Sequence, residues 1–446
     1  MADPPAGEPV PVRFRGSGAG VDVLSWGQQE YWQMMQDGWL PIGAVTPLPP
    51  GTTVEDAAGD LAFVMGSYPS MRTRLRFDPD GPKQVVSQSG EVGLEVVEAP
   101  VDADPAQVAE QVRKRYWDRD YDFVGEWPVR MAVVRHRGAL THRVWVMCHL
   151  VTDGGGAPVI LRELAARDAS GSRAARTALE QAAWQRSPAG QRQSESALRW
   201  WGRVLREVPA RRFPARPATA YPRFWQAAFR SPAAGLAVRV VAARTGLESS
   251  SVLLGCLAVS LARVTGQRLV VFRPDVSNRF RPGLGSTVSP VVQFGLCRVD
   301  VPDGTVDQAL ALARRRAMTA YKYAYYDPAR LAGLREQVAA ERGEPVDAGC
   351  LFNDRRRRPA GEAGPPPEPA QVRAAGPASS FEWTHRQDAV ELPHLALAVN
   401  DVPEAEAISM TVTCDIHYVA PELVEEYVRG IEQVVVAAAL DPAART

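Results

Sequence analysis

One short run of this chain combines residue types that can do chemistry: Cys148-His149-Leu150-Val151-Thr152-Asp153-Gly154-Gly155-Gly156. Histidine is the side chain whose ordinary pKa best suits proton transfer near neutral pH. A histidine that ends an apolar stretch and precedes a glycine-rich loop can be held rigidly and still meet a substrate. The run therefore indicates acid–base chemistry at His149.

Each residue of this run also has a structural interpretation. His149 could move a proton or be a buried histidine bonded to the backbone, and Asp153 could pair with an arginine or be a plain loop carboxylate. Gly154 and Gly155 could bring amides close to a substrate, as in an oxyanion hole, or only form a turn. Cys148 alternates with His149 along a strand, so its side chain should face away and fill apolar space.

A strand before this run and a helix after it must position these residues. Residues 143–151 are apolar on both faces, which is typical of a buried central strand, and 156–166 begins a helix. A helix over 25–34 has Ser25 as its predicted N-cap. The remaining patterns predict helices over 54–67, 105–116, 173–206, 249–264, 306–321 and 421–439, and strands over 72–77, 84–86, 130–135, 225–229, 269–273, 288–301, 394–401 and 409–417.

The length of 446 residues predicts two domains. Both halves mix helices and strands in a similar way, which favours two related α/β lobes. We expect a disordered leader over 1–20, an N-terminal lobe over 21–208 and a linker over 209–222. The C-terminal lobe would cover 223–446 and contain a mobile loop over 355–380, which is rich in Arg, Pro and Gly.

Composition argues against several classes of protein. The net charge of zero draws the chain neither to nucleic acid nor to an anionic membrane. No apolar run reaches about 18 residues, so no transmembrane helix is expected. The five cysteines are scattered without a Cys-x-x-Cys pair, which predicts a reduced, cytoplasmic protein without a zinc site. His149 and Asp153 lack a third ligand nearby, so we expect no metal.

Several segments resemble, in order and spacing, the condensation domains of nonribosomal peptide synthetases. Ser25-x-x-Gln28-x-x-x-Trp32 resembles that family's opening Ser-x-Ala-Gln-x-Arg-Leu-Trp, with Gly27 for Ala. The run from His149 to Gly154 corresponds to the His-His-x-x-x-Asp-Gly motif. Residues 276–279 match Val-Ser-Gly-Arg, and 288–300 align with Val-Gly-x-Phe-Val-Asn-Thr-Leu-Pro-Leu-Arg-Val-Asp. The resemblance covers about residues 22–440.

The chain also departs from the family pattern. Cys148 replaces the first His of the motif, and Gly156 stands where Ser is common. Ser289 and Gln293 replace Gly and Asn in the segment that crosses between the lobes. The Glu-Gly-His-Gly-Arg segment of epimerization domains and the Asp-x-x-x-x-Asp motif of heterocyclization domains are absent. No adenylation or carrier region follows, so we expect a stand-alone enzyme or an excised domain.

The resemblance implies a fold and a site. Two chloramphenicol acetyltransferase-like lobes would form a V-shaped pseudo-dimer with a central tunnel and His149 at its middle. Asp153 would pair with Arg279 as a structural clamp. Cys148, Ser289 and Gln293 would line the tunnel.

The resemblance also implies a reaction. A carrier protein would present an acyl, aminoacyl or peptidyl thioester on its phosphopantetheine arm, and an amine or hydroxyl would accept the acyl group in natural-product biosynthesis, such as that of an antibiotic. The chain would need no cofactor of its own and would act as a monomer. Two alternatives remain: an acyltransferase of the same fold that uses a free small-molecule acceptor, and an inactive docking module that recruits a partner enzyme.

Overall fold

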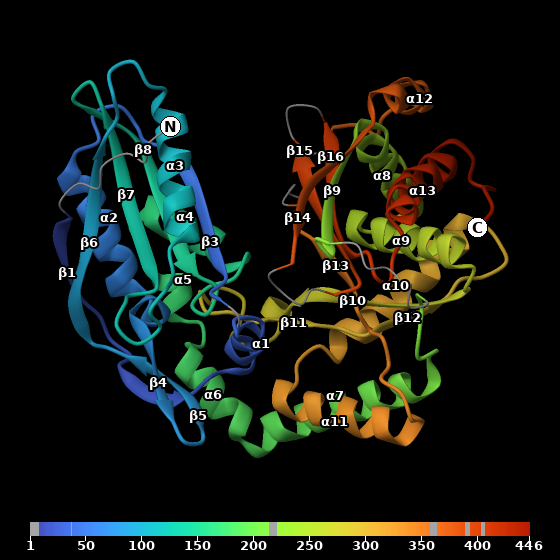
Figure 1. Cartoon of the computed structure of the whole chain (residues 1–446), viewed down its shortest axis with the longest axis horizontal. Coiled ribbons are helices and arrows are strands. Elements are labelled where there is room, and N and C mark those ends of the chain that lie inside the picture. The colour runs from blue at the N-terminus through green and yellow to red at the C-terminus, as the bar shows by residue number, and fades with distance from the viewer. Residues whose placement is uncertain (1–8, 37, 214–220, 357–363, 389–392, 403–405) are drawn as a thin grey trace. The chain divides into compact units, whose positions relative to one another are not determined.

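The chain divides into two units, each built around a large mixed sheet (Figure 1). The computed structural model describes all residues except 1–8, 37, 214–220, 357–363, 389–392 and 403–405. Unit 1 consists of Met1–Ser194 and Ser277–Gln293. Unit 2 consists of Glu195–Val276 and Phe294–Thr446. This mixture of helices and sheets confirms the predicted α/β class.

The strands of unit 1 form two sheets. They are β1 (Val10–Arg15), β2 (Gly20–Val23), β3 (Pro41–Pro47), β4 (Thr73–Asp78), β5 (Gly81–Val86), β6 (Ser89–Glu98), β7 (Val129–His136) and β8 (Ala139–Cys148). Within the described residues, the larger sheet has the order β1-β6-β7-β8-β3 and the smaller one β2-β5-β4. Strands β6 and β7 run parallel, so they need a crossover connection, which a helix over 105–118 supplies.

Helices cover both faces of the larger sheet. The helical segments of unit 1 are α1 (Trp26–Met34), α2 (Val54–Ser67), η1 (Pro69–Arg72), α3 (Pro105–Asp118), α4 (Gly156–Ala166), α5 (Ser170–Arg173), α6 (Ala178–Arg186) and η2 (Asn278–Phe280). Trp145 and Met147 of β8 lie in one core with α2 and α4, whereas Val144 and Val146 lie in a second core with α3. Strand β8 is apolar on both faces because both faces are covered.

Unit 2 contains a larger sheet with helices packed on it. Its strands are β9 (Phe224–Ser231), β10 (Leu269–Ser277), β11 (Val292–Phe294), β12 (Cys297–Asp300), β13 (Cys350–Asp354), β14 (Ser380–Gln387), β15 (Leu395–Val402) and β16 (Ala407–Asp415). In the described part of the chain their order is β11-β10-β13-β15-β16-β9-β14, with β12 beside β10. The helical segments are α7 (Pro188–Glu207), α8 (Pro232–Thr245), α9 (Ser249–Thr265), α10 (Val306–Lys322), α11 (Pro328–Arg342), α12 (Pro369–Ala375), η3 (Gly376–Ala378) and α13 (Pro421–Leu440).

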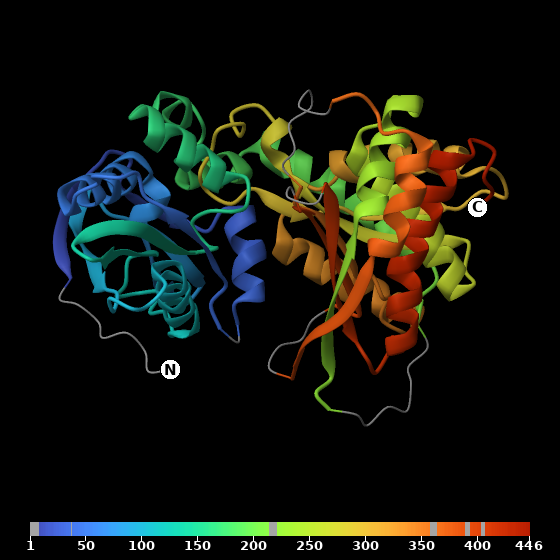
Figure 2. The same ribbon diagram turned by 90° about the horizontal axis from the view of Figure 1, so that it is seen from above.

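The main core of unit 2 lies between this sheet and the helices α8, α9, α10 and α13. Figure 2 shows α8 and α13 side by side along one face of the sheet. Among the described helices, no single one is long and apolar enough to cross a membrane. Only when α8 and α9 are taken together, with a bend of 109° between them, are the length and apolar composition sufficient for a membrane span.

Several expected domain limits are wrong. Within the expected disordered leader, Val10–Arg15 forms β1, because Val12 and Phe14 alternate into the core beside β6. The first limit between units falls after Ser194 instead of 208, because α7 packs Ala197 and Trp201 into a core of unit 2. Residues 277–293 return to unit 1. The expected mobile loop over 355–380 contains α12 and η3, while 357–363 lie outside the described residues.

Candidate functional site

His149 lies in a turn directly after a central strand of unit 1. Strand β8 ends at Cys148, three residues earlier than the sequence predicted, because the Val151 amide turns back to the Cys148 carbonyl at 3.1 Å. The His149 amide donates to the carbonyl of Leu40 at 2.8 Å, and its side chain is half-buried. The turn thus removes His149 from the strand while the sheet still anchors its backbone.

The imidazole of His149 has a defined orientation. Its Nδ1 lies 2.9 Å from the carbonyl oxygen of Thr152. A carbonyl oxygen only accepts hydrogen bonds, so Nδ1 carries the proton and the lone pair of the neutral ring is on Nε2. The neutral imidazole can therefore accept a proton at Nε2. The imidazolium that results keeps its hydrogen bond from Nδ1 to the Thr152 carbonyl.

Tyr31 is a site residue that sequence reasoning missed. Its ring stacks on the imidazole of His149, with centroids 4.3 Å apart and planes at 13°. Tyr31 lies on α1, whose N-terminus Ser25 and Gln28 close as a reciprocal capping box. The only signal was that Tyr31 occupies the Leu position of the opening segment quoted above, and that signal does not show what the ring contacts.

Asp153 holds the turn together with both carboxylate oxygens. The residue is fully buried. Its Oδ1 accepts from the Gly155 and Gly156 amides at 3.0 Å each, and its Oδ2 accepts from the Val291 and Val292 amides at 2.9 and 3.3 Å. Backbone donors thus surround the anion on two sides, which suits a charge at the start of α4.

Arg279 completes this arrangement as a forked partner of Asp153. Its Nη2 lies 2.7 Å from Oδ1, its Nη1 lies 3.0 Å from Oδ2, and Nη2 also donates to the Thr287 carbonyl at 3.0 Å. The ion pair expected between Asp153 and Arg279 is therefore present. Each carboxylate oxygen of Asp153 accepts from three donors, so the residue has a structural role and is a poor candidate for a general base.

Three glycines follow Asp153 in the turn, and glycine can adopt a positive φ that other residues rarely adopt. None of Gly154, Gly155 and Gly156 has a positive φ. Gly155 is needed for space instead, because a Cβ there would lie 2.5 Å from Nη1 of Arg279. Its amide is bonded to Asp153, so the predicted oxyanion donor at Gly155 is wrong. An oxyanion role for Gly154 stays a prediction.

Three residues expected to line a tunnel are buried inside unit 1. Cys148 is fully buried in the core, and burial raises the pKa of its thiol to about 12, which makes it an inert space-filler. Ser289 accepts a hydrogen bond from Gln181 at 2.7 Å, and Gln293 donates to Glu30 at 3.4 Å. These contacts show that the side chains serve packing and hydrogen bonding within the unit, as expected for Cys148, and a tunnel-lining role for the three residues stays a prediction.

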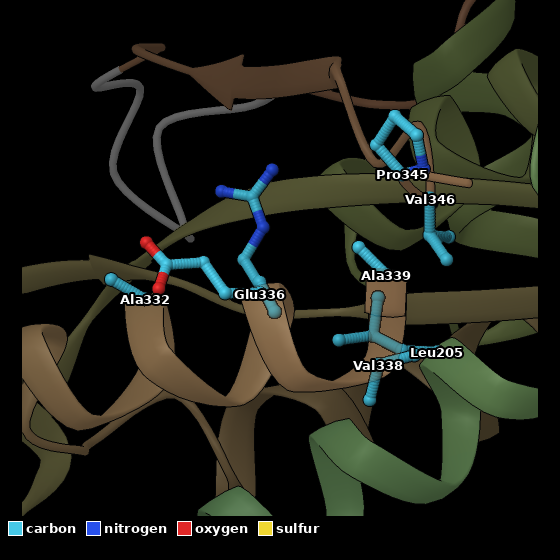
Figure 3. Close-up of a pocket in the computed structure, with 8 residues that line it drawn as sticks. Leu205, Ala332, Glu336, Val338, Ala339, Pro345 and Val346 are labelled. Carbon is cyan, nitrogen blue, oxygen red and sulfur yellow. The ribbon is translucent and has the colours of Figure 1, made fainter. Parts of the chain in front are cut away.

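Two hollows in the described part of the chain lie away from these residues. One, of about 290 Å³, is an apolar groove between α7 and α11 where Leu205, Val338 and Val346 gather (Figure 3). Another, of about 620 Å³, includes the ion pair of Asp354 and Arg356. Both belong to unit 2, so neither is a site for His149. No group of three or more potential metal ligands occurs among the described residues.

A family model and several solved structures match this chain. Residues 52–348 match the family model for the Condensation domain. A comparison with curated proteins finds no match.

Four solved structures have the same fold. The X-domain from teicoplanin biosynthesis is 18% identical at a TM-score of 0.67, covering 95% of this chain and 96% of that one. The complex of the X-domain and OxyB is 17% identical at a TM-score of 0.66, covering 96% of this chain and 95% of that one. A condensation domain that mediates chain release from the enacyloxin polyketide synthase is 19% identical at a TM-score of 0.71, covering 97% of this chain and 85% of that one. SgcC5 from Streptomyces globisporus, solved in complex with a naphthyl ethanediol and sucrose, is 14% identical at a TM-score of 0.69. The match covers 95% of this chain and 100% of that one.

Proposed function

This chain belongs to the Condensation domain family, and we propose that it transfers an acyl group from a carrier-protein thioester to an amine or hydroxyl acceptor. The observation that supports this proposal most is the orientation of His149. Its Nδ1 is bonded to the Thr152 carbonyl, so Nε2 is the proton acceptor of the neutral ring. The family match covers the turn that contains both residues.

The proposed reaction uses one proton acceptor. The acceptor nitrogen or oxygen attacks the thioester carbonyl, and Nε2 of His149 takes the proton that the nucleophile loses. The new C–N or C–O bond forms, the C–S bond breaks, and the imidazolium returns the proton to the departing phosphopantetheine sulfur. The Thr152 carbonyl keeps its hydrogen bond to Nδ1 in both protonation states, which holds the ring while its charge changes.

Several finer expectations remain part of this proposal. Phosphopantetheine would arrive on a partner carrier protein, and the chain itself would hold no metal or cofactor. The arrangement of two lobes around a tunnel, the monomeric state and the cytoplasmic location stay predictions.

Replacement of His149 by alanine tests the proposal. Carrier proteins encoded beside this gene would be loaded with acyl and aminoacyl thioesters and offered amines and alcohols, and the product would be followed by mass spectrometry. His149→Ala should abolish transfer while circular dichroism stays unchanged. The matched control is His142→Ala, because His142 lies on β8 and its Nδ1 contacts Thr141 instead of the turn. Wild-type turnover in His149→Ala would refute the proposed role.

A free small-molecule acceptor is a second candidate. The likeness to SgcC5, whose structure holds a small aryl diol, supports it at the level of the fold. Saturable turnover with a soluble alcohol or amine, and a single carrier protein or coenzyme A as donor, would favour this candidate.

A docking module without catalysis is a third candidate. The likeness to the X-domain, which is also solved in complex with OxyB, supports it, together with the loss of the first His at Cys148. Tight binding of a partner enzyme without acyl transfer, unchanged in His149→Ala, would favour this candidate over the first two.

A further inference from the structure

The aromatic face beside His149 is the feature that the proposed chemistry leaves unexplained. Tyr31 lies parallel to the imidazole at a centroid distance of 4.3 Å. Flat, nearly parallel contact of two rings restricts tilting of either ring and adds about 0.5–1.5 kcal/mol beyond burial. Tyr31 therefore acts on the orientation of the imidazole plane.

The helix that bears Tyr31 is itself held firmly. The Trp26 amide at its start donates to Oε1 of Gln185 on α6 at 2.9 Å. Gly27 packs so closely on residue 290 that a Cβ would lie 2.2 Å from the Pro290 carbonyl oxygen. The ring of Tyr31 is thus presented from a fixed helix instead of a loop.

The two contacts of His149 restrict different motions. The hydrogen bond from Nδ1 to the Thr152 carbonyl fixes one edge of the ring but permits rotation about the line that joins the two atoms. Stacking on Tyr31 opposes that rotation, because it would tilt the imidazole out of the plane of the phenol. Together the two contacts fix the direction in which Nε2 points.

We propose that Tyr31 is a positioning residue that fixes the imidazole plane of His149 and thereby the direction of its Nε2 lone pair. This inference rests on the proposed function of His149 as proton acceptor. The resembling family segment has Leu at this position, and a leucine side chain has no flat face. Ring stacking on the histidine is thus a property of this chain's own sequence.

Nuclear magnetic resonance of the histidine rings tests positioning without any turnover. The chain has six histidines, so the imidazole ¹H–¹⁵N spectrum is small, and His149→Ala identifies the His149 signals. In the wild type and in Tyr31→Phe, the His149 ring protons should show the upfield shift of a stacked ring and the nitrogens the Nδ1–H tautomer. In Tyr31→Leu the upfield shift is lost with the tyrosine ring, and the His149 signals should broaden as the imidazole rotates about its hydrogen bond, while the Nδ1–H tautomer is kept.

Trp32→Leu is the matched control. Trp32 is the next residue of α1, but its ring contacts Phe77 and Phe123 instead of His149. The His149 signals should therefore stay unchanged in this variant. If Tyr31→Leu does not fold, Tyr31→Gln replaces it as the variant without a ring.

Kinetics provide the second readout. Tyr31→Leu should lower kcat by roughly 10- to 100-fold with little change in KM, because misdirection of a catalytic group affects the transition state. Tyr31→Phe should restore most of the loss. His149 ring signals as sharp in Tyr31→Leu as in the wild type would overturn the inference even if transfer depends on His149. Broadened His149 signals in Tyr31→Leu, without transfer by the wild type, would support positioning and contradict only the proposed function.

Discussion

Replacement of Arg279 by alanine should destabilise unit 1 by several kcal/mol, because it leaves a fully buried carboxylate without its cation. Removal of one partner from a buried ion pair costs about 3–5 kcal/mol. Asp153 would keep four backbone amides as donors, which places the expected loss near the lower end, at about 3 kcal/mol. At about 2–4 °C per kcal/mol for a unit of this size, Tm should fall by about 6–12 °C.

Urea unfolding combined with hydrogen exchange measures this loss where it occurs. Peptides over 139–166 contain β8, the turn and α4, and their exchange in Arg279→Ala should rise far more than that of peptides in unit 2. Arg13→Ala is the matched control, because Arg13 and its partner Glu91 are 90% and 52% exposed, and such pairs contribute less than about 1 kcal/mol. Equal losses of stability in the two variants would refute the reasoning about the buried pair.

Two further predictions concern a close contact and a titration. Gly156→Ser, which introduces the residue common in the family, should cost about 1–3 kcal/mol, because its Cβ would lie 2.6 Å from the Val288 carbonyl oxygen. Gly154→Ser has open space and should be neutral in thermal unfolding; similar Tm values for the two variants would contradict the prediction. In unit 2, burial raises the pKa of Asp347, but His394 at 3.3 Å and other partners outweigh burial and lower the pKa to about 2. The carboxylate should therefore contribute about 2 kcal/mol above pH 4 and lose this contribution as the pH falls towards 2; a constant stability difference from Asp347→Asn between pH 5 and 2 would show otherwise.

Short-range patterns predicted much of the local structure. Residues 54–67 and 156–166 form α2 and α4 with the expected limits, and Ser25 caps α1 as expected. Periodic burial and capping chemistry act within a few residues, so they can be read from the sequence. The edge strand β1 was missed because its partner β6 lies about 80 residues away in the sequence.

The sequence by itself determined the residue types of the candidate site: His149 for proton transfer, Asp153 before a glycine run, and Arg279 as the expected partner of Asp153. The tertiary structure decided what each residue contacts. It placed Tyr31 on the imidazole, bonded the Gly155 amide to Asp153, and buried Cys148, Ser289 and Gln293 within unit 1. Such contacts join segments far apart in the chain, and their geometry depends on how the helices and sheets pack, which no local pattern specifies.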